Sequence, residues 1–156
     1  MKAYLAGAIE HAPDNGIAWR RDVTQFLADI LGHTVYDPTT EELSILSQEE
    51  SANFRGYKQN NLPEYQRIVR KLIAHDLSIL TTDIDYVICL WDNYVKNGGG
   101  TQGEITVSHL HGIPVYLVSE METEKISGWI LGCVSKVFTS FEELENHLVQ
   151  KYGEKG

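Results

Sequence analysis

The chain has 156 residues, of which 42% are hydrophobic and 22% charged, as expected of one globular domain with a core of its own. Thirteen basic against 22 acidic residues give a net charge of -9, which argues against a nucleic-acid polymer or an anionic membrane as partner, because both bind basic surfaces. A single nucleoside or nucleotide stays possible, since such a ligand needs only a few local donors.

Cysteine content and hydropathy indicate a cytosolic protein. The two cysteines, Cys89 and Cys133, lie apart in apolar runs, so we expect both to be buried and reduced, with neither a disulfide nor a zinc site. The amino terminus becomes polar too early for a signal peptide, and no apolar stretch approaches the roughly 20 residues of a membrane span. No repeat or linker interrupts the chain, so we predict a single domain over residues 1–156.

The sequence of the first part of the chain predicts two strands, a helix and a less regular segment. Residues 3–6 form an apolar run typical of a buried strand, and residues 34–36 predict a second strand. Between them, apolar residues at helical spacing predict a helix over 17–31, with Gly32 as its stop signal. Residues 41–60 are polar, and we expect only a short helix and a loop there.

The second part alternates helices and strands more regularly. We predict helices over 63–80, 101–111 and 140–151, and strands over 86–91, 114–118 and 134–138. The continuous apolar run of the strand at 86–91 is typical of a strand covered on both faces. Ser140 and Glu143 have the spacing of a capping box at the start of the last helix.

This alternation predicts an α/β fold, namely a flavodoxin-like three-layer sandwich around a five-stranded, mainly parallel sheet of order 2-1-3-4-5. In such sheets ligands bind at the carboxyl ends of the strands, where the strand order reverses. The loops after the first strand (7–10) and the third strand (92–103) should therefore face each other across one crevice.

The second of these loops reads "NGGGTQGEI" over residues 97–105 and places Glu104 at a helix start. Taken alone, this pattern fits a tight connection with an acid favoured by the helix dipole, a phosphate-binding turn, or a loop that delivers Glu104 to a substrate. It lacks the Lys of a P-loop and the spacing of a dinucleotide-binding turn, so phosphate binding and phosphoryl transfer are disfavoured.

Three segments carry a more specific signal: "YLAGAI" (4–9), "HDLSILTTDIDYVICLWD" (75–92) and "GGTQGEITVSHLHGIPVYLV" (99–118). In order and spacing they resemble the nucleoside 2-deoxyribosyltransferase superfamily, which includes the 2'-deoxynucleoside 5'-phosphate N-hydrolases. The resemblance implies transfer of a 2-deoxyribosyl group between nucleobases through a covalent glycosyl-enzyme, with the β anomer retained. It also implies a homo-oligomer, and we expect no cofactor.

The resemblance implies catalytic roles for three side chains. Glu104 matches the glutamate that attacks the anomeric carbon, Asp76 an aspartate that assists base departure and acceptor activation, and Tyr4 a tyrosine that holds the glutamate. A carboxylate below the anomeric carbon suits this reaction, because N-glycoside cleavage passes through an oxocarbenium-like state. From the residues alone, Tyr4 also fits a core tyrosine and Asp76 a surface helix acid.

Substrate contacts are expected from both loops and from the end of the central strand. The expected contact residues are Gly7, Ala8, Ile9, Trp91, Asp92, Gly100 and Thr101. The resemblance implies the first three as the lining of the sugar and base pocket. Asp92 is a candidate second acid, and Trp91 either stacks on a base or belongs to the sheet. Asp83 and Asp85 fit turn and cap roles, and the histidines show no metal-site spacing, so we expect no metal.

The chain departs from the superfamily in two places. Where the transferases carry a further acid before the glutamate, residues 97–100 read Asn-Gly-Gly-Gly. The segment 125–135, which in those enzymes supplies an Asn to a neighbouring subunit, contains no Asn.

The charges near the predicted crevice favour a free 2'-deoxynucleoside and a nucleobase over a nucleotide. Glu10 would repel a 5'-phosphate, and Lys96 is the only cation between Asp92 and Glu104. The N-hydrolase remains an alternative. A non-catalytic nucleotide-sensing module is a further alternative from another class, although it would not need Tyr4, Asp76 and Glu104 together.

Overall fold

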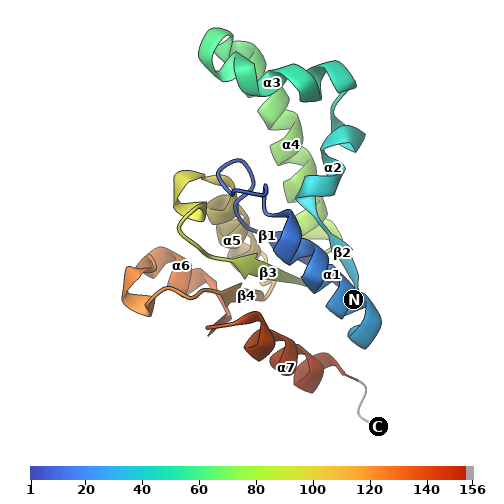
Figure 1. Ribbon diagram of the computed structural model, residues 1–156, viewed down its shortest axis with the longest axis vertical. Helices are drawn as coiled ribbons and strands as arrows, with labels where there is room; N and C mark the ends of the chain where they lie inside the picture. The colour runs from blue at the N-terminus through green and yellow to red at the C-terminus, as the bar shows by residue number, and fades with distance from the viewer. Residues whose placement is uncertain (154–156) are drawn as a thin grey trace.

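The computed structural model describes residues 1–153, and at its centre lies a parallel sheet of five strands (Figure 1). The strands are β1 (Lys2–Ala6), β2 (Thr34–Tyr36), β3 (Tyr86–Leu90), β4 (Val115–Val118) and β5 (Lys136–Phe138). Their order is β2-β1-β3-β4-β5, and every neighbouring pair is parallel. The predicted α/β class and strand order are confirmed, and the sheet is parallel throughout.

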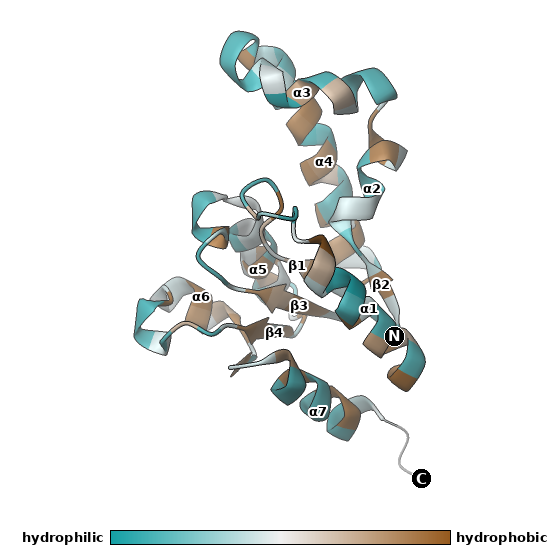
Figure 2. Cartoon of the chain, viewed as in Figure 1, coloured by the Kyte–Doolittle hydropathy of each residue, from teal (hydrophilic) through white to brown (hydrophobic). Residues whose placement is uncertain are grey.

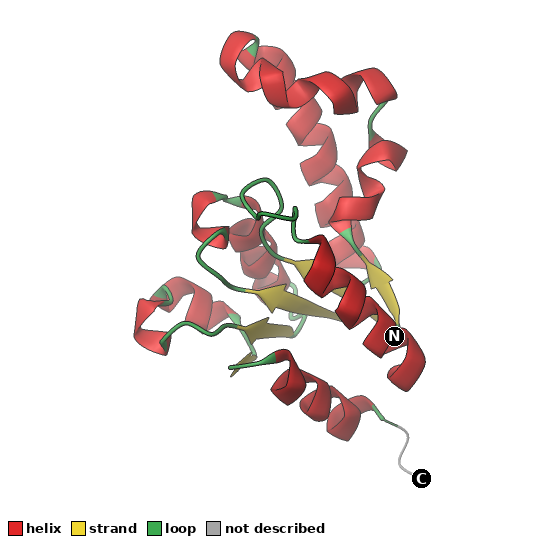
Figure 3. Cartoon of the chain, viewed as in Figure 1, coloured by secondary structure: helices red, strands yellow, loops and turns green. Residues whose placement is uncertain are grey.

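Helices cover both faces of the sheet (Figure 3). They are α1 (Ile17–Leu31), α2 (Pro38–Ile45), α3 (Gln48–Asn60), α4 (Leu62–Thr82), α5 (Gly100–Leu110), α6 (Gly128–Cys133) and α7 (Phe141–Tyr152), with short 3-10 turns η1 (Val95–Asn97) and η2 (Thr123–Lys125). Helices α1 and α7 pack on one face, and α4, α5 and α6 pack on the other. The result is the predicted three-layer sandwich.

Each face of the sheet has its own apolar core, and the strands are among the most hydrophobic parts of the chain (Figure 2). Leu5 and Ile88 pack against Leu27 of α1, whereas Val87 packs on the opposite face in the core that contains Ile105 of α5. Alternating strand residues point to opposite faces, so a strand covered twice needs a continuous apolar run. This double burial fixes the carboxyl ends of the strands, where the site lies.

The segment before α4 differs from the prediction of one short helix and a loop, because it forms the two helices α2 and α3. Ser47 and Glu50 make a full capping box that starts α3. These helices pack with α4 around a small separate core of three buried residues: Leu46, Phe54 and Ile68. In Figure 1, α3 and the adjoining ends of α2 and α4 project beyond the sheet as a helical arm.

Smaller differences concern helix ends and the carboxyl-terminal part. Helix α6 was not predicted, and α4 extends by one or two residues at each end beyond 63–80. At α7, Ser140 accepts a hydrogen bond from the Glu143 backbone as predicted, but the Glu143 carboxylate accepts from the Thr139 amide instead of the Ser140 amide. Cys89 is buried as predicted, whereas Cys133 is half-buried; neither forms a disulfide.

Within residues 1–153, no helix combines the length and the apolar character needed to cross a membrane.

Asp83 and Asp85 lie at the amino-terminal end of β3, where Asp85 accepts a hydrogen bond from the Lys2 amide at 2.6 Å and Asp83 pairs with the Lys2 side chain. Asp83 is also the C-cap residue of α4, as predicted, whereas Asp85 contacts the start of β1, and both aspartates lie away from the candidate site.

Candidate active site

A cavity of about 730 Å³ opens at the carboxyl ends of β1 and β3. Its near side consists of the loop after β1 and the glycine-rich loop before α5, and its far side consists of α2, α3 and α4. The predicted site residues that line it are Gly7, Ala8, Ile9, Asp76, Gly100, Thr101 and Glu104. The volume is typical of a site for a small organic ligand.

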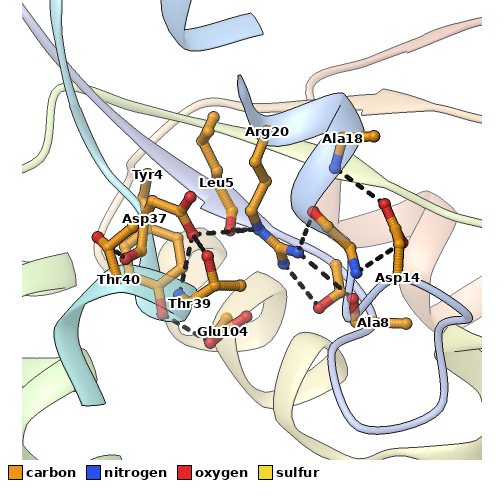
Figure 4. Close-up of polar contacts among 12 residues, drawn as sticks. Tyr4, Leu5, Ala8, Asp14, Ala18, Arg20, Asp37, Thr39, Thr40 and Glu104 are labelled. Atoms are coloured by element: carbon orange, nitrogen blue, oxygen red, sulfur yellow. Dashed lines mark hydrogen bonds and ion pairs between the residues drawn. The ribbon is translucent and has the colours of Figure 1, made fainter. Parts of the chain in front are cut away.

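Glu104 lies in the first turns of α5 and is held by Tyr4 from the centre of β1 (Figure 4). The Tyr4 hydroxyl donates a hydrogen bond of 2.7 Å to Glu104 Oε1. Tyr4 is fully buried, so its hydroxyl is directed by the sheet and not by solvent. Within residues 1–153, Glu104 Oε2 accepts no hydrogen bond, which leaves this oxygen available to a ligand.

Glu104 is poised between its two protonation states near neutral pH. Burial raises its pKa to about 7, and the negative charge of Asp76 acts in the same direction. The Tyr4 hydrogen bond and the positive charge of Arg20 oppose this shift. A carboxylate with so high a pKa is less solvated and more nucleophilic once ionised than an ordinary surface glutamate.

Asp76 enters the same cavity from α4 and is held by a second tyrosine. Tyr36, the last residue of β2, donates a hydrogen bond of 2.6 Å from its hydroxyl to Asp76 Oδ1. Burial raises the pKa of Asp76, while the Tyr36 hydrogen bond and the nearby His75 lower it. Asp76 is therefore no ordinary surface acid: it is half-buried and hydrogen-bonded at the cavity wall.

Arg20 of α1 organises the loop after β1 (Figure 4). The guanidinium is completely buried and donates hydrogen bonds to the backbone carbonyls of Leu5, Gly7, Ala8 and Gly16. Gly16 has a φ of 71°, and a side chain there would collide with the Ala8 carbonyl and with Arg20. Arg20 therefore fixes the backbone of a loop that lines the cavity.

Asp37 connects this arginine to the second strand and the helical arm. Its carboxylate lies 3.5 Å from Arg20 Nε and also accepts from the Thr39 amide and hydroxyl at the start of α2. One buried ion pair thus joins α1, the end of β2 and the cap of α2.

Two predicted contact residues lie elsewhere. Trp91 is buried in the apolar core beside Ile105 and Ile130, and it does not line the cavity. Asp92 Oδ1 accepts hydrogen bonds from the Tyr94 and Val95 amides, so this carboxylate caps η1 and is also absent from the cavity wall. The structure therefore does not bring either residue to the wall of this cavity.

The far wall of the cavity is partly apolar and partly acidic. Phe54, Tyr65 and Leu72 contribute apolar surface from α3 and α4. Arg55, the one arginine of the wall in the part of the chain that the structure describes, is paired with Glu42 at 2.6 Å, so its charge is largely neutralised. Within residues 1–153, no group of three or more His, Cys, Asp or Glu side chains is arranged to hold a metal ion.

Comparison with known proteins gives a result at the level of the fold. No protein-family model and no curated protein matches the chain. A solved structure of a 2-deoxyribosyltransferase from Bacillus psychrosaccharolyticus is 24% identical to this chain, covers 94% of it and 91% of its own length, and superposes with a TM-score of 0.65. The chain has the fold of a 2-deoxyribosyltransferase. A conserved protein from Enterococcus faecalis V583 shares the same 2-deoxyribosyltransferase-like fold at 16% identity, with 97% of this chain and 98% of that chain covered and a TM-score of 0.66.

Two residues of this candidate site were not predicted. Arg20 is spaced with Val23 and Leu27 on the buried face of α1, and a cation on such a face is a signal that the sequence contains. Tyr36 lies opposite Tyr4 in the register of β2 and β1, which no local pattern reveals. Both residues matter because they position the loop and the acid at the cavity.

Proposed function

We propose that this protein is a member of the nucleoside 2-deoxyribosyltransferase superfamily and transfers a 2-deoxyribosyl group from one nucleobase to another. The observation that carries the proposal is the pair of carboxylates, Glu104 and Asp76, each held by a buried tyrosine at one cavity. The shared fold and the sequence segments around both acids support it.

In the first half-reaction, Glu104 is the nucleophile. Its Oε2 lone pair forms a bond to C1' of the deoxyribose while the C1'–N bond breaks and its electron pair leaves with the base. Asp76 supplies a proton to the departing base nitrogen, since a neutral base is a better leaving group than its anion. Because charge builds up at C1' in the oxocarbenium-like transition state, the adjacent carboxylate also stabilises it electrostatically.

In the second half-reaction, a different base takes the place of the first. A ring nitrogen of this acceptor attacks C1', its proton passes to Asp76, and Glu104 leaves as a carboxylate. Two inversions at C1' retain the β anomer. The glycine-rich loop suits this exchange, because residues 98–100 line the cavity without side chains that would obstruct a sugar or a base.

The charges of the cavity favour a free 2'-deoxynucleoside over a 5'-phosphate. Glu10, Glu42, Asp76 and Glu104 all line it, and the arginine on its wall, Arg55, is already paired with Glu42. A phosphate dianion would meet net negative charge there. An uncharged nucleobase, in contrast, would gain stacking contacts between its ring faces and the aromatic side chains of the far wall.

The decisive experiment for this activity is incubation with a 2'-deoxynucleoside and a different free base, with the products separated by chromatography. Formation of the new nucleoside supports the transferase, and its yield should require the added base. Free base and free sugar alone would indicate an N-hydrolase. If neither a nucleoside nor a deoxynucleotide is turned over, both enzymatic functions are wrong and a non-catalytic module is favoured.

The pH profile of a Tyr4→Phe variant should report the ionisation of Glu104. The nucleophile must be ionised, so kcat/KM of the native enzyme should rise with pH through the Glu104 pKa of about 7. Removing the Tyr4 hydrogen bond removes an interaction that lowers this pKa, so the rising limb should shift to higher pH. Activity at pH 6 should therefore fall more than activity at pH 9. A limb that stays in place or shifts to lower pH contradicts the assignment.

A further inference from the structure

Tyr36 occupies a position equivalent to that of Tyr4 on the neighbouring strand. Tyr4 and Tyr36 are direct partners in the register of β1 and β2, and their rings stack with centroids 5.2 Å apart and an interplanar angle of 24°. Tyr4 holds Glu104 and Tyr36 holds Asp76. The two carboxylates of the cavity are thus supported by one stacked pair of tyrosines.

The hydrogen bond from Tyr36 fixes which oxygen of Asp76 can carry a proton. Tyr36 is buried, and within residues 1–153 its hydroxyl has one hydrogen-bonding partner, Asp76 Oδ1. Burial and the Asp76 charge raise the pKa of Tyr36, so the phenol stays protonated and donates. If Oδ1 carried the acidic proton, it would be a weaker acceptor for the phenol hydrogen than a carbonyl or carboxylate oxygen, and this weakening in a buried position costs free energy.

We propose that Tyr36 is a positioning residue that occupies Asp76 Oδ1 and thereby reserves Oδ2 for proton exchange with the nucleobase. This rests on the transferase function proposed above. As the C1'–N bond breaks and its electron pair goes to the base, the proton on Oδ2 passes to the base nitrogen; in the second half-reaction the acceptor base returns a proton to Oδ2. Tyr36 keeps its own proton throughout.

Tyr36 is itself held on two sides. Its ring is stacked on Tyr4, and the next residue, Asp37, is paired with the buried Arg20. The charged and titratable groups around its hydroxyl come from three helices: Glu41 of α2, His75 and Asp76 of α4, and Glu104 of α5. Because its ring and the neighbouring Asp37 are both held in this way, Tyr36 sets the direction of the Asp76 carboxylate relative to Glu104.

The test compares Tyr36→Phe in two backgrounds, the native protein and Asp76→Asn. In the native background we expect kcat to fall by about 10- to 100-fold with KM changed by no more than about threefold, as for a misdirected proton donor. In the Asp76→Asn background, Tyr36→Phe should lower kcat by less than about threefold, since there is no acid left to direct. Nucleosides whose base leaves readily without protonation should show a smaller loss.

Tyr57→Phe is the matched control, because it removes a phenol hydroxyl from α3 outside the cavity lining, and its rates should equal those of the native protein. The role of Tyr36 is overturned if Tyr36→Phe lowers kcat equally in both backgrounds, or if it leaves kcat unchanged. In either case, turnover by the native protein means that the transferase function still stands. If the native protein turns over no nucleoside, the proposed function fails and the role of Tyr36 fails with it.

Carbon-13 NMR titration of Asp76 should show a higher pKa in Tyr36→Phe, and an unchanged pKa contradicts the hydrogen-bond argument.

Discussion

Glu104→Gln should lower the rate of deoxyribosyl transfer by about 10⁴-fold or more, because the amide lacks the negative charge that must bond to C1'. The variant keeps the shape of the side chain and an oxygen that accepts from Tyr4, so the fold should be retained. The measurement is kcat/KM for one 2'-deoxynucleoside and one acceptor base, together with a denaturant unfolding curve for each protein.

The control for this variant is Glu120→Gln, which removes an exposed carboxylate that does not line the cavity. Its kcat/KM should stay within about twofold of the native value, in line with a surface substitution. Retention of more than a few per cent of native activity by Glu104→Gln would show that another group is the nucleophile.

Arg20→Met should destabilise the fold by about 3–5 kcal/mol, the typical cost of removing one partner of a buried ion pair. The change leaves Asp37 without its cation and removes the hydrogen bonds that Arg20 donates to the backbone carbonyls of Leu5, Gly7 and Gly16. Urea unfolding measured by far-UV circular dichroism should show a much lower midpoint. In the folded fraction, KM should rise, since the loop that lines the cavity is no longer fixed.

The adjacent Arg21 provides the matched control, because its side chain is 71% exposed and, among residues 1–153, pairs only with its sequence neighbour Asp22. Arg21→Met should change the free energy of unfolding by no more than about 0.5 kcal/mol. Arg20→Lys should recover only part of the stability, since a lysine cannot reproduce the planar set of donors. Equal midpoints for Arg20→Met and Arg21→Met would contradict the structural role of Arg20.

The central sandwich could be predicted from the sequence because its signals are local. Each inner strand is apolar on both faces, so its run of residues is continuous, and glycines mark the ends of the adjoining helices. The meeting of the two loops at the cavity could be predicted from the rule that ligands bind at the carboxyl ends of parallel strands, where the strand order reverses. The helical arm lacks such an apolar run, because its core contains three buried residues: Leu46, Phe54 and Ile68. It does contain a local signal, the capping box of Ser47 and Glu50 at the start of α3.

The site was only partly accessible to the same reasoning. Glu104 lies near the start of α5 and Tyr4 at the centre of β1, and their contact follows from the way these elements meet at the crevice. Asp76 reaches the same cavity from within α4. Trp91 and Asp92 follow a strand that ends at the same edge, but the chain turns there, and Asp92 is used to cap η1. The role of Tyr36 depends on strand register and on a contact 40 residues away in sequence, which sequence spacing does not encode.

The central claim, a covalent glycosyl-enzyme on Glu104, is tested most directly by intact-protein mass spectrometry. The protein is mixed with a 2'-deoxynucleoside in the absence of an acceptor base and quenched rapidly in acid. We expect a mass increase equal to one deoxyribosyl group, located on Glu104 by peptide mapping, absent from Glu104→Gln and removed when an acceptor base is added before the quench. An adduct on another residue would contradict the account. So would turnover without any adduct, measured under conditions in which the base is released faster than the deoxyribosyl group is transferred.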